Sequence, residues 1–276
     1  MEIFKRLKPK SEELVYFLSF MAYALAKPTW RTMTDSSYEA WVYEFQWKRQ
    51  LDALKKKKLI ELEKSTRDLR TNSRIVRLTE AGHTHALGGR DPEARWDRAW
   101  DGKWRVVLFD VPMEKKQLRN KLRRSLRARA FGCLQQSVWI TPDPLDEETK
   151  IFQQAETDTK SLLTLEARPA TGESDEEIVL QAWDFEEINR RYSKVLEIIE
   201  QRPEQQLDTE SAAGKFRKWA GQERAAWFAA MEKDPLLPAN LLPPGYLGRK
   251  AWQARVKAMR LAHERINGFE IGSWRK

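Results

Sequence analysis

The hydrophobic periodicity of this 276-residue chain changes along its length, and these changes restrict the folds open to it. Apolar residues recur every three or four positions up to about residue 57, a pattern typical of amphipathic helices. Two short alternating runs follow, at 59–63 and 74–78, and indicate strands. The middle of the chain mixes strand and helix patterns, and the pattern beyond 185 is helical again. We therefore expect an α+β protein with three parts.

The charge of the chain is distributed unevenly over these parts. Residues 1–100 hold 20 Lys and Arg against 14 Asp and Glu, residues 101–135 hold 10 against 3, and residues 136–276 hold 20 against 24. The resulting net charges of +6, +7 and −4 sum to +9. Because the basic excess lies in the first half, we expect that half to bind a polyanion such as double-stranded DNA.

The first part, residues 1–90, is predicted to be a winged helix DNA-binding domain. Three helical segments, a hairpin and a short helix starting at 79–82 follow one another in the order of a winged helix-turn-helix. The third helix is expected at 42–57, and the hairpin tip at 64–73 is basic. The predicted DNA-binding residues are Gln46, Lys48, Arg49, Lys56, Lys64, Arg67, Arg70 and Arg74. The alternative is a small helical interaction domain whose Lys55–Lys58 run is a solvated helix end.

The middle part, residues 100–184, is predicted to be a ferredoxin-like dimerisation domain of the βαββαβ type. Its helix at 115–129 carries eight Lys or Arg and no acid. The expected strands are 104–111, 134–140, 162–166 and 178–183, with a second helix at 146–159. Helices cover one face of such a sheet, so the other face requires a partner.

The last part, residues 185–276, is predicted to be a helical C-terminal domain. Helices are expected at 185–201, 211–232 and 248–267. Between the last two, residues 234–248 alternate prolines with leucine pairs, which indicates an ordered turn because a flexible linker would be polar.

Several classes of chemistry find no support in the sequence. A single cysteine, Cys133, allows neither an intramolecular disulfide nor a cysteine-based zinc site, and suggests a reducing cytoplasm. His83, His85 and His263 do not supply a usual metal-ligand set. No export signal, membrane span, phosphate loop or nucleophile triad is visible. We therefore expect no cofactor, no metal and no enzymatic activity.

Three stretches together resemble the PaaX-type repressors, named for control of phenylacetic acid degradation. They are Trp100-Asp-Gly-Lys-Trp-Arg-Val-Val-Leu-Phe-Asp-Val-Pro112, residues 118–142 and residues 234–248. The resemblance implies a cytoplasmic, dimeric transcription regulator that an aromatic acyl-coenzyme A releases from its operator. The cations expected to hold the coenzyme phosphates are Arg123, Arg127 and Arg129. Gly245-Tyr246-Leu247-Gly248 departs from the family's Asp-Trp-Pro-Gly turn, so the inducer is expected to differ.

The middle part also resembles the ferredoxin-like nuclease of CRISPR adaptation. That resemblance implies an alternative function, in which Asp110 and its symmetry mate bind Mg²⁺ and activate water against a phosphodiester. The favoured interpretation is that Asp110 caps a strand or pairs with an arginine of the basic helix. A scaffold that binds proteins rather than DNA is a third possibility.

Overall fold

The computed structural model describes residues 11, 15, 49–64, 74–145, 162–170, 172–204 and 210–272. The chain divides into two compact units. The first unit comprises Met1–Phe4, Asp91–Arg191 and Ala230–Leu247, and the second comprises Lys5–Arg90, Tyr192–Ala229 and Gly248–Lys276. The predicted boundaries at 90, 100 and 185 stay a prediction.

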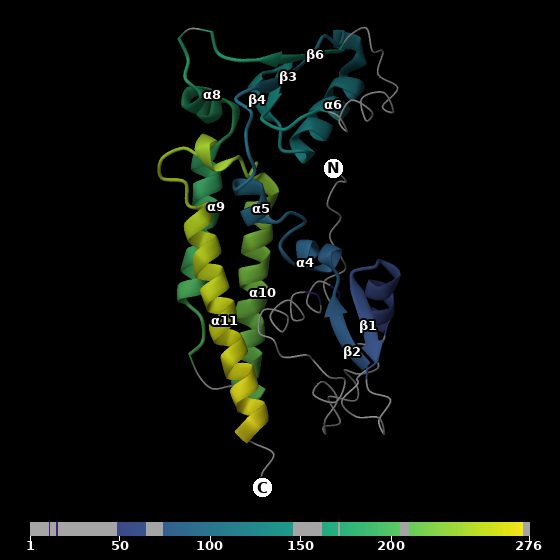
Figure 1. The fold of residues 1–276 in the computed structure, drawn as a ribbon, viewed down its shortest axis with the longest axis vertical. Coiled ribbons are helices and arrows are strands. Elements are labelled where there is room, and N and C mark those ends of the chain that lie inside the picture. Colours follow the sequence, from purple (N-terminus) through teal and green to yellow (C-terminus); the bar gives the residue numbers. More distant parts are fainter. Residues whose placement is uncertain are drawn as a thin grey trace. The chain divides into compact units, whose positions relative to one another are not determined.

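A four-stranded antiparallel sheet forms the centre of the first unit (Figure 1). Its strands, in the order β4-β5-β3-β6, are β3 (Trp104–Phe109), β4 (Gly132–Gln135), β5 (Val138–Thr141) and β6 (Leu162–Ala167). Since β5 pairs antiparallel with both β3 and β4, those two strands run in the same direction. Helix α6 (Lys116–Ala128) connects them, which makes a split β-α-β unit of the ferredoxin-like kind. The helix predicted at 146–159 lies outside the described residues.

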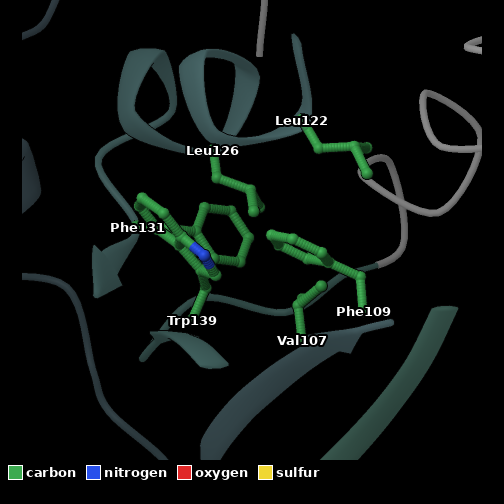
Figure 2. Close-up of a cluster of buried hydrophobic side chains, with 6 residues drawn as sticks. All are labelled: Val107, Phe109, Leu122, Leu126, Phe131 and Trp139. Carbon is green, nitrogen blue, oxygen red and sulfur yellow. The ribbon is translucent and has the colours of Figure 1, made fainter. Parts of the chain in front are cut away.

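Helix α6 packs on the sheet through a stripe of leucines. Leu122 and Leu126 lie one turn apart and are 2% and 0% exposed. Figure 2 shows them above Val107, Phe109, Phe131 and Trp139, which are also buried. Val107 and Phe109 share a sheet face because alternate residues of a strand point the same way. The four-residue spacing of these leucines therefore puts both of them on the inner face of the helix.

Two strand predictions in the middle part are wrong. The stretch 134–140 was expected to be one strand, but β4 and β5 form a hairpin that turns at Gln136 and Ser137. Neither turn residue is the Gly, Asn or Asp that usually marks a tight hairpin, so the sequence carries no signal for it.

The predicted strand at 178–183 is also wrong, because helix α8 (Asp175–Ala182) occupies it. Ser174 and Glu177 form a capping box, in which each side chain accepts from the other residue's backbone N–H. Ile178, Val179 and Leu180 favoured a strand by composition, whereas the cap starts a helix four residues earlier. The fourth strand of the sheet is β6.

The first unit also contains shorter elements and an ordered proline-leucine turn. The elements are α5 (Pro92–Trp96), η1 (Met113–Lys115), η3 (Ala239–Leu241) and the start of α9 (Phe185–Glu200). Residues 234–238 are all buried, which confirms the prediction of an ordered turn. The Tyr246 hydroxyl donates to the Asp234 carboxylate and accepts from Trp96 Nε1 at 3.2 Å. Tyr246 thus supplies a polar contact at the position where the resemblance implied a tryptophan.

The second unit contains long helices and a two-stranded hairpin. Helices α10 (Glu210–Lys233) and α11 (Gly248–Gly272) confirm the helical prediction for this region, with α11 ending five residues later than expected. Strands β1 (Ile60–Lys64) and β2 (Arg74–Leu78) pair antiparallel, and α4 (Glu80–Ala86) follows. Most of the region predicted to hold the first helices lies outside the described residues, so the winged helix-turn-helix stays a prediction. Among the helices that the structure describes, none combines the length and the apolar composition that a bilayer span requires.

Tryptophans and a buried ion pair form the core between the helices of the second unit. Trp227 packs against Tyr192 and Trp252, with ring centroids 5.9 and 5.5 Å away. Arg255 Nε donates to Glu223 Oε1 at 2.8 Å, and both side chains are at most 2% exposed. The Arg255 guanidinium lies 4.8 Å from the centroid of Trp227. A buried charge pair with one defined geometry restricts how α10 and α11 can slide past each other.

Candidate nucleic-acid interface

A run of four exposed lysines ends the helix that precedes the hairpin. Residues 49–56 are helical, with Leu51 and Leu54 buried and Lys55–Lys58 exposed. Lys58 has a positive φ of 57°, a left-handed conformation in which glycine is usual. The Leu59 N–H donates to the Leu54 carbonyl and the Lys58 N–H to the Lys55 carbonyl, which completes a Schellman end. The chain thus keeps a cation where a glycine would be less strained.

The start of α4 holds this helix end in place. The Thr79 hydroxyl donates to the Lys58 carbonyl at 2.7 Å, and the Thr79 N–H donates to the Leu59 carbonyl at 3.1 Å. Gly82 lies so close that a Cβ on it would be 2.0 Å from the Leu59 carbonyl oxygen. Any larger residue at 82 would therefore displace the lysine run from the base of the hairpin.

The structure describes only some of the predicted DNA-binding residues. Arg49 and Lys56 are exposed on the helix that ends in the lysine run. Lys64 and Arg74 are cross-strand partners at the tip end of the hairpin. Gln46, Lys48, Arg67 and Arg70 lie outside the described residues. Sequence reasoning treated Lys58 only as a solvated helix end, because a left-handed lysine has no sequence signature.

A second concentration of positive charge lies on α6. Residues 115–129 contain eight Lys or Arg. Six of them have no ion pair with an acid among the residues that the structure describes: Lys115, Lys116, Lys121, Arg123, Arg124 and Arg127. Arg123 donates instead to the backbone carbonyl and side-chain oxygen of Gln136, at 3.2 and 3.3 Å. The Arg127 guanidinium lies 5.6 Å from the ring centroid of Trp139. Both arginines are held in place by neutral groups.

The three arginines expected to bind an acyl-coenzyme A do not gather at one point. Arg123 and Arg127 are one turn apart on the same side of α6. Arg129 lies on another side, and its guanidinium donates back to the carbonyl and hydroxyl of Ser125. The structure therefore places two of the three together.

Asp110 follows directly after β3 and is exposed. Within the described ranges it forms no ion pair and no hydrogen bond, so the expected pairing with an arginine of α6 is not found. Those ranges also contain no group of three or more His, Cys, Asp or Glu that could hold a metal ion. His83 and His85 lie on α4, where burial lowers the pKa of His83.

Other arginines of the first unit are paired with acids and serve the fold. Asp143 follows β5 and accepts from Arg95 Nη2 at 2.5 Å and from Arg98 Nε at 2.7 Å. Arg98 also donates to the Leu236 carbonyl at 2.5 Å, which ties α5 to the proline-leucine turn. Burial raises the pKa of Asp143, but the two arginines outweigh it and the net shift is downward.

Arg105 of β3 makes a second such cluster. Its two terminal nitrogens donate to both carboxylate oxygens of Asp101, at 2.7 and 2.6 Å. This pair of hydrogen bonds lowers the pKa of Asp101 to about 2. Because the guanidinium of Arg105 is 7% exposed, its charge is satisfied inside the unit. These arginines have acidic partners, whereas six of the cations at 115–129 have none among the described residues.

Comparison with known proteins identifies the sheet and its helix. Residues 97–179 match the family described as the PaaX protein central Cas2-like domain. The matched residues lie in the first unit and include β3, α6, β4, β5 and β6, so the similarity lies in the sheet and the helix packed on it. This match confirms the resemblance to the PaaX-type proteins seen in the sequence.

One solved structure extends the comparison to nearly the whole chain. The uncharacterized protein Rv0674 from Mycobacterium tuberculosis is similar with a TM-score of 0.56 and 19% sequence identity. The similarity covers 94% of this chain and 98% of that chain. At this identity the comparison shows a shared fold. No curated protein matches the chain.

The Asp143 cluster predicts a pH-dependent contribution to stability. Asp143→Asn should lower the free energy of unfolding by about 1–3 kcal/mol at neutral pH, because two charge-assisted hydrogen bonds are lost. The folded pKa of Asp143 is depressed, so its stabilisation is present above the unfolded pKa, about 3.9, and is lost as the pH falls through the lower folded value. Urea unfolding of both proteins across this range measures the difference.

The control for this comparison is Asp110→Asn, which removes an exposed carboxylate. It should leave the urea midpoint unchanged at neutral pH. Equal stability of Asp143→Asn and the original protein would show that the arginine cluster contributes nothing to the fold.

Proposed function

We propose that the chain is a DNA-binding transcription regulator of the cytoplasm, acting as a repressor and not as an enzyme. The observation that carries this proposal is the PaaX central domain at 97–179, since a domain of that family suggests a transcription regulator. The exposed lysine run at the base of the β1–β2 hairpin supports it independently.

Phosphate contacts from the second unit would supply much of the affinity. Lys55–Lys58 lie beside the base of the hairpin, and its tip carries Lys64, Arg67, Arg70 and Arg74. Cations that neutralise phosphates release counterions, so binding by these residues depends strongly on salt. Gln46, Lys48 and Arg49 are proposed to reach base edges, where each good bidentate contact discriminates by about 1–3 kcal/mol.

A second copy of the chain is the proposed partner of the sheet face that α6 leaves open. On that face, Leu163 and Leu165 of β6 are 53% and 45% exposed and lie opposite Leu108 and Val106 of β3. Trp183 and Ala182 pack near Gly132 at the β4 end of the sheet and leave the β6 end uncovered. Adjacent apolar side chains that are exposed on β6 and half-buried on β3 indicate an interface. A twofold pairing of this face would present two DNA-binding units to a near-palindromic operator.

An effector would act by binding one dimer geometry more tightly than the other, because a ligand shifts an equilibrium only by its differential affinity. The family resemblance proposes an aromatic acyl-coenzyme A for this role. Its phosphates require cations, for which the sequence proposes Arg123, Arg127 and Arg129.

The rival function is a Mg²⁺-dependent nuclease that uses Asp110. The exposure of this carboxylate at the end of β3, without an ion pair or hydrogen bond in the described ranges, is the observation in its favour. One carboxylate per chain would need the twofold mate to complete a metal site.

Selection of bound fragments from the source genome tests the regulator. We expect enriched, uncut and roughly symmetric sites, and on such a site Arg70→Ala should reduce the slope of log affinity against log salt by about 1. Lys250→Ala, which removes an exposed lysine from α11, is the matched control and should keep the slope. If Arg70→Ala and the original protein have equal slopes, Arg70 does not contact phosphate and the predicted position of the wing is wrong.

The same selection separates the alternatives when it is repeated with Mg²⁺ and with phenylacetyl-coenzyme A. Mg²⁺-dependent cutting that disappears in Asp110→Asn would establish the nuclease. Release of the enriched fragments by the thioester supports the effector, whereas unchanged retention rules out that compound. A protein scaffold would enrich no fragment at all.

Lys58 predicts a conflict between stability and DNA binding. Lys58→Gly and Lys58→Ala both remove the charge and should weaken DNA binding equally. Only glycine relieves the left-handed strain, so Lys58→Gly should be more stable than Lys58→Ala by about 1 kcal/mol. Urea midpoints and DNA titrations of the two variants measure both effects. Unchanged DNA affinity in both would remove Lys58 from the interface.

The sheet-face dimer predicts a change of mass on a charge substitution. Leu163→Arg combined with Leu165→Glu should convert a dimer to a monomer in analytical ultracentrifugation, because charged groups would be buried against the second copy. Ala128→Arg at the end of α6 is the control, since Ala128 is exposed on the helix that covers the other face of the sheet. If the double variant keeps the dimer mass, the interface lies elsewhere.

A further inference from the structure

The solvent-facing side of α6 carries a dense group of cations that the fold itself does not require. Residues 115–142 contain eight Lys or Arg and no Asp or Glu. Like charges three or four positions apart repel one another on a helix. The pairs Lys116–Arg119, Arg119–Arg123 and Arg123–Arg127 all have this spacing. Such a helix carries an electrostatic cost that a bound polyanion would remove.

Three of the cations form one line along the helix. At 100° per residue, Lys116, Arg123 and Arg127 lie within about 40° of one another, and they span about 16 Å at a rise of 1.5 Å per residue. Lys116 and Arg127 are exposed and Arg123 is half-buried. Because the leucines of α6 pack on the sheet, this line lies on the flank of the helix beside the β4–β5 turn, where Arg123 contacts Gln136 and Arg127 lies over Trp139. We name Lys116, Arg123 and Arg127 the α6 stripe.

We infer that the α6 stripe binds the phosphate backbone of duplex DNA, independently of base sequence and in addition to the lysine run of the second unit. Duplex DNA carries one negative charge per about 1.7 Å of its axis, so a stripe of this length faces several phosphates. The arginine fork suits phosphate oxygens, and Arg123 keeps three of its five donors after its two bonds to Gln136.

The shape and composition of this face distinguish DNA from other anionic partners. A coenzyme needs cations that converge on a concave site, because ligand pockets bury most of the ligand. The α6 stripe is instead extended along the convex side of a helix. A protein interface would have an apolar centre, whereas the neighbours of the stripe on this face are Gln117, Asn120, Lys121 and Arg124.

Salt-dependent binding of the full chain to a random-sequence duplex tests this inference. The triple variant Lys116→Gln, Arg123→Gln, Arg127→Gln should lower the slope of log affinity against log salt by about 2.7, at about 0.9 per phosphate contact. The loss of affinity should be the same for every duplex sequence. A slope equal to that of the original protein would overturn the inference.

Two further variants separate phosphate contact from net charge and from packing. Lys215→Gln, Lys250→Gln, Lys257→Gln removes the same charge from exposed positions of α10 and α11 and should keep the slope. If this control lowers the slope equally, net charge alone is responsible and the stripe has no role. Arg123→Lys, Arg127→Lys keeps the charge and should keep most of the slope, whereas a full loss would point to lost packing on Gln136 and Trp139.

The outcomes also separate this inference from the proposed regulator. A lowered slope with no enriched genomic fragment would retain the α6 stripe and refute operator recognition. Enriched fragments with an unchanged slope would support operator recognition and refute phosphate binding by the α6 stripe. Binding of coenzyme A that the triple variant abolishes, without any change in the DNA slope, would assign the stripe to a small phosphate ligand and overturn the inference.

Discussion

The packing of α6 on its sheet is the interaction on which the charge arrangement of the first unit depends. Leu122 and Leu126 must face Val107, Phe109 and Trp139, because no other side of the helix is apolar (Figure 2). The helix is amphipathic, with an apolar side and a basic side, so burial of the leucines directs the cations away from the core. The hydrophobic contact therefore fixes which side of α6 carries the positive charge.

Among the described residues of the first unit, some arginines pair with an acidic side chain and others contact only neutral groups. Arg95, Arg98 and Arg105 bond to Asp143 or Asp101 and hold α5, β3 and the proline-leucine turn together. Arg123 and Arg127 are steadied by a neutral amide and an indole ring instead. A cation held by neutral groups keeps its charge available to a ligand. The pairing pattern is thus a better guide to binding than the number of basic residues.

Sequence alone predicted the elements whose signal is periodic. The helices α6, α9, α10 and α11 and the β1–β2 hairpin were found because their apolar spacing extends over several turns or alternations. The β4–β5 hairpin was missed because Gln136 and Ser137 carry no turn signature, and α8 was misread because its Ile-Val-Leu composition favoured a strand and its capping box was not recognised. The sequence predicted where the positive charge of the candidate site lies, because counting Lys and Arg located both basic regions. The sequence did not predict the geometry of the site. It did not show that Lys58 has a left-handed backbone or that Gln136 holds Arg123. Each of these depends on a residue brought near by the fold or on a local backbone angle, and neither is encoded in spacing along a helix.

The two basic surfaces differ in how their positions are maintained. The lysine run ends a helix at a strained residue, and it is held by hydrogen bonds from Thr79 and by the close approach of Gly82. The α6 stripe lies on a continuous helix whose inner face is fully packed. A strained terminus persists only while its surroundings enforce it, so the position of the lysine run depends on Thr79 and Gly82. A rigid helical face keeps its charge spacing whatever the base sequence, which suits contacts that follow the backbone. Both surfaces are proposed to contact phosphates, but only the lysine run depends on a strained backbone for its position.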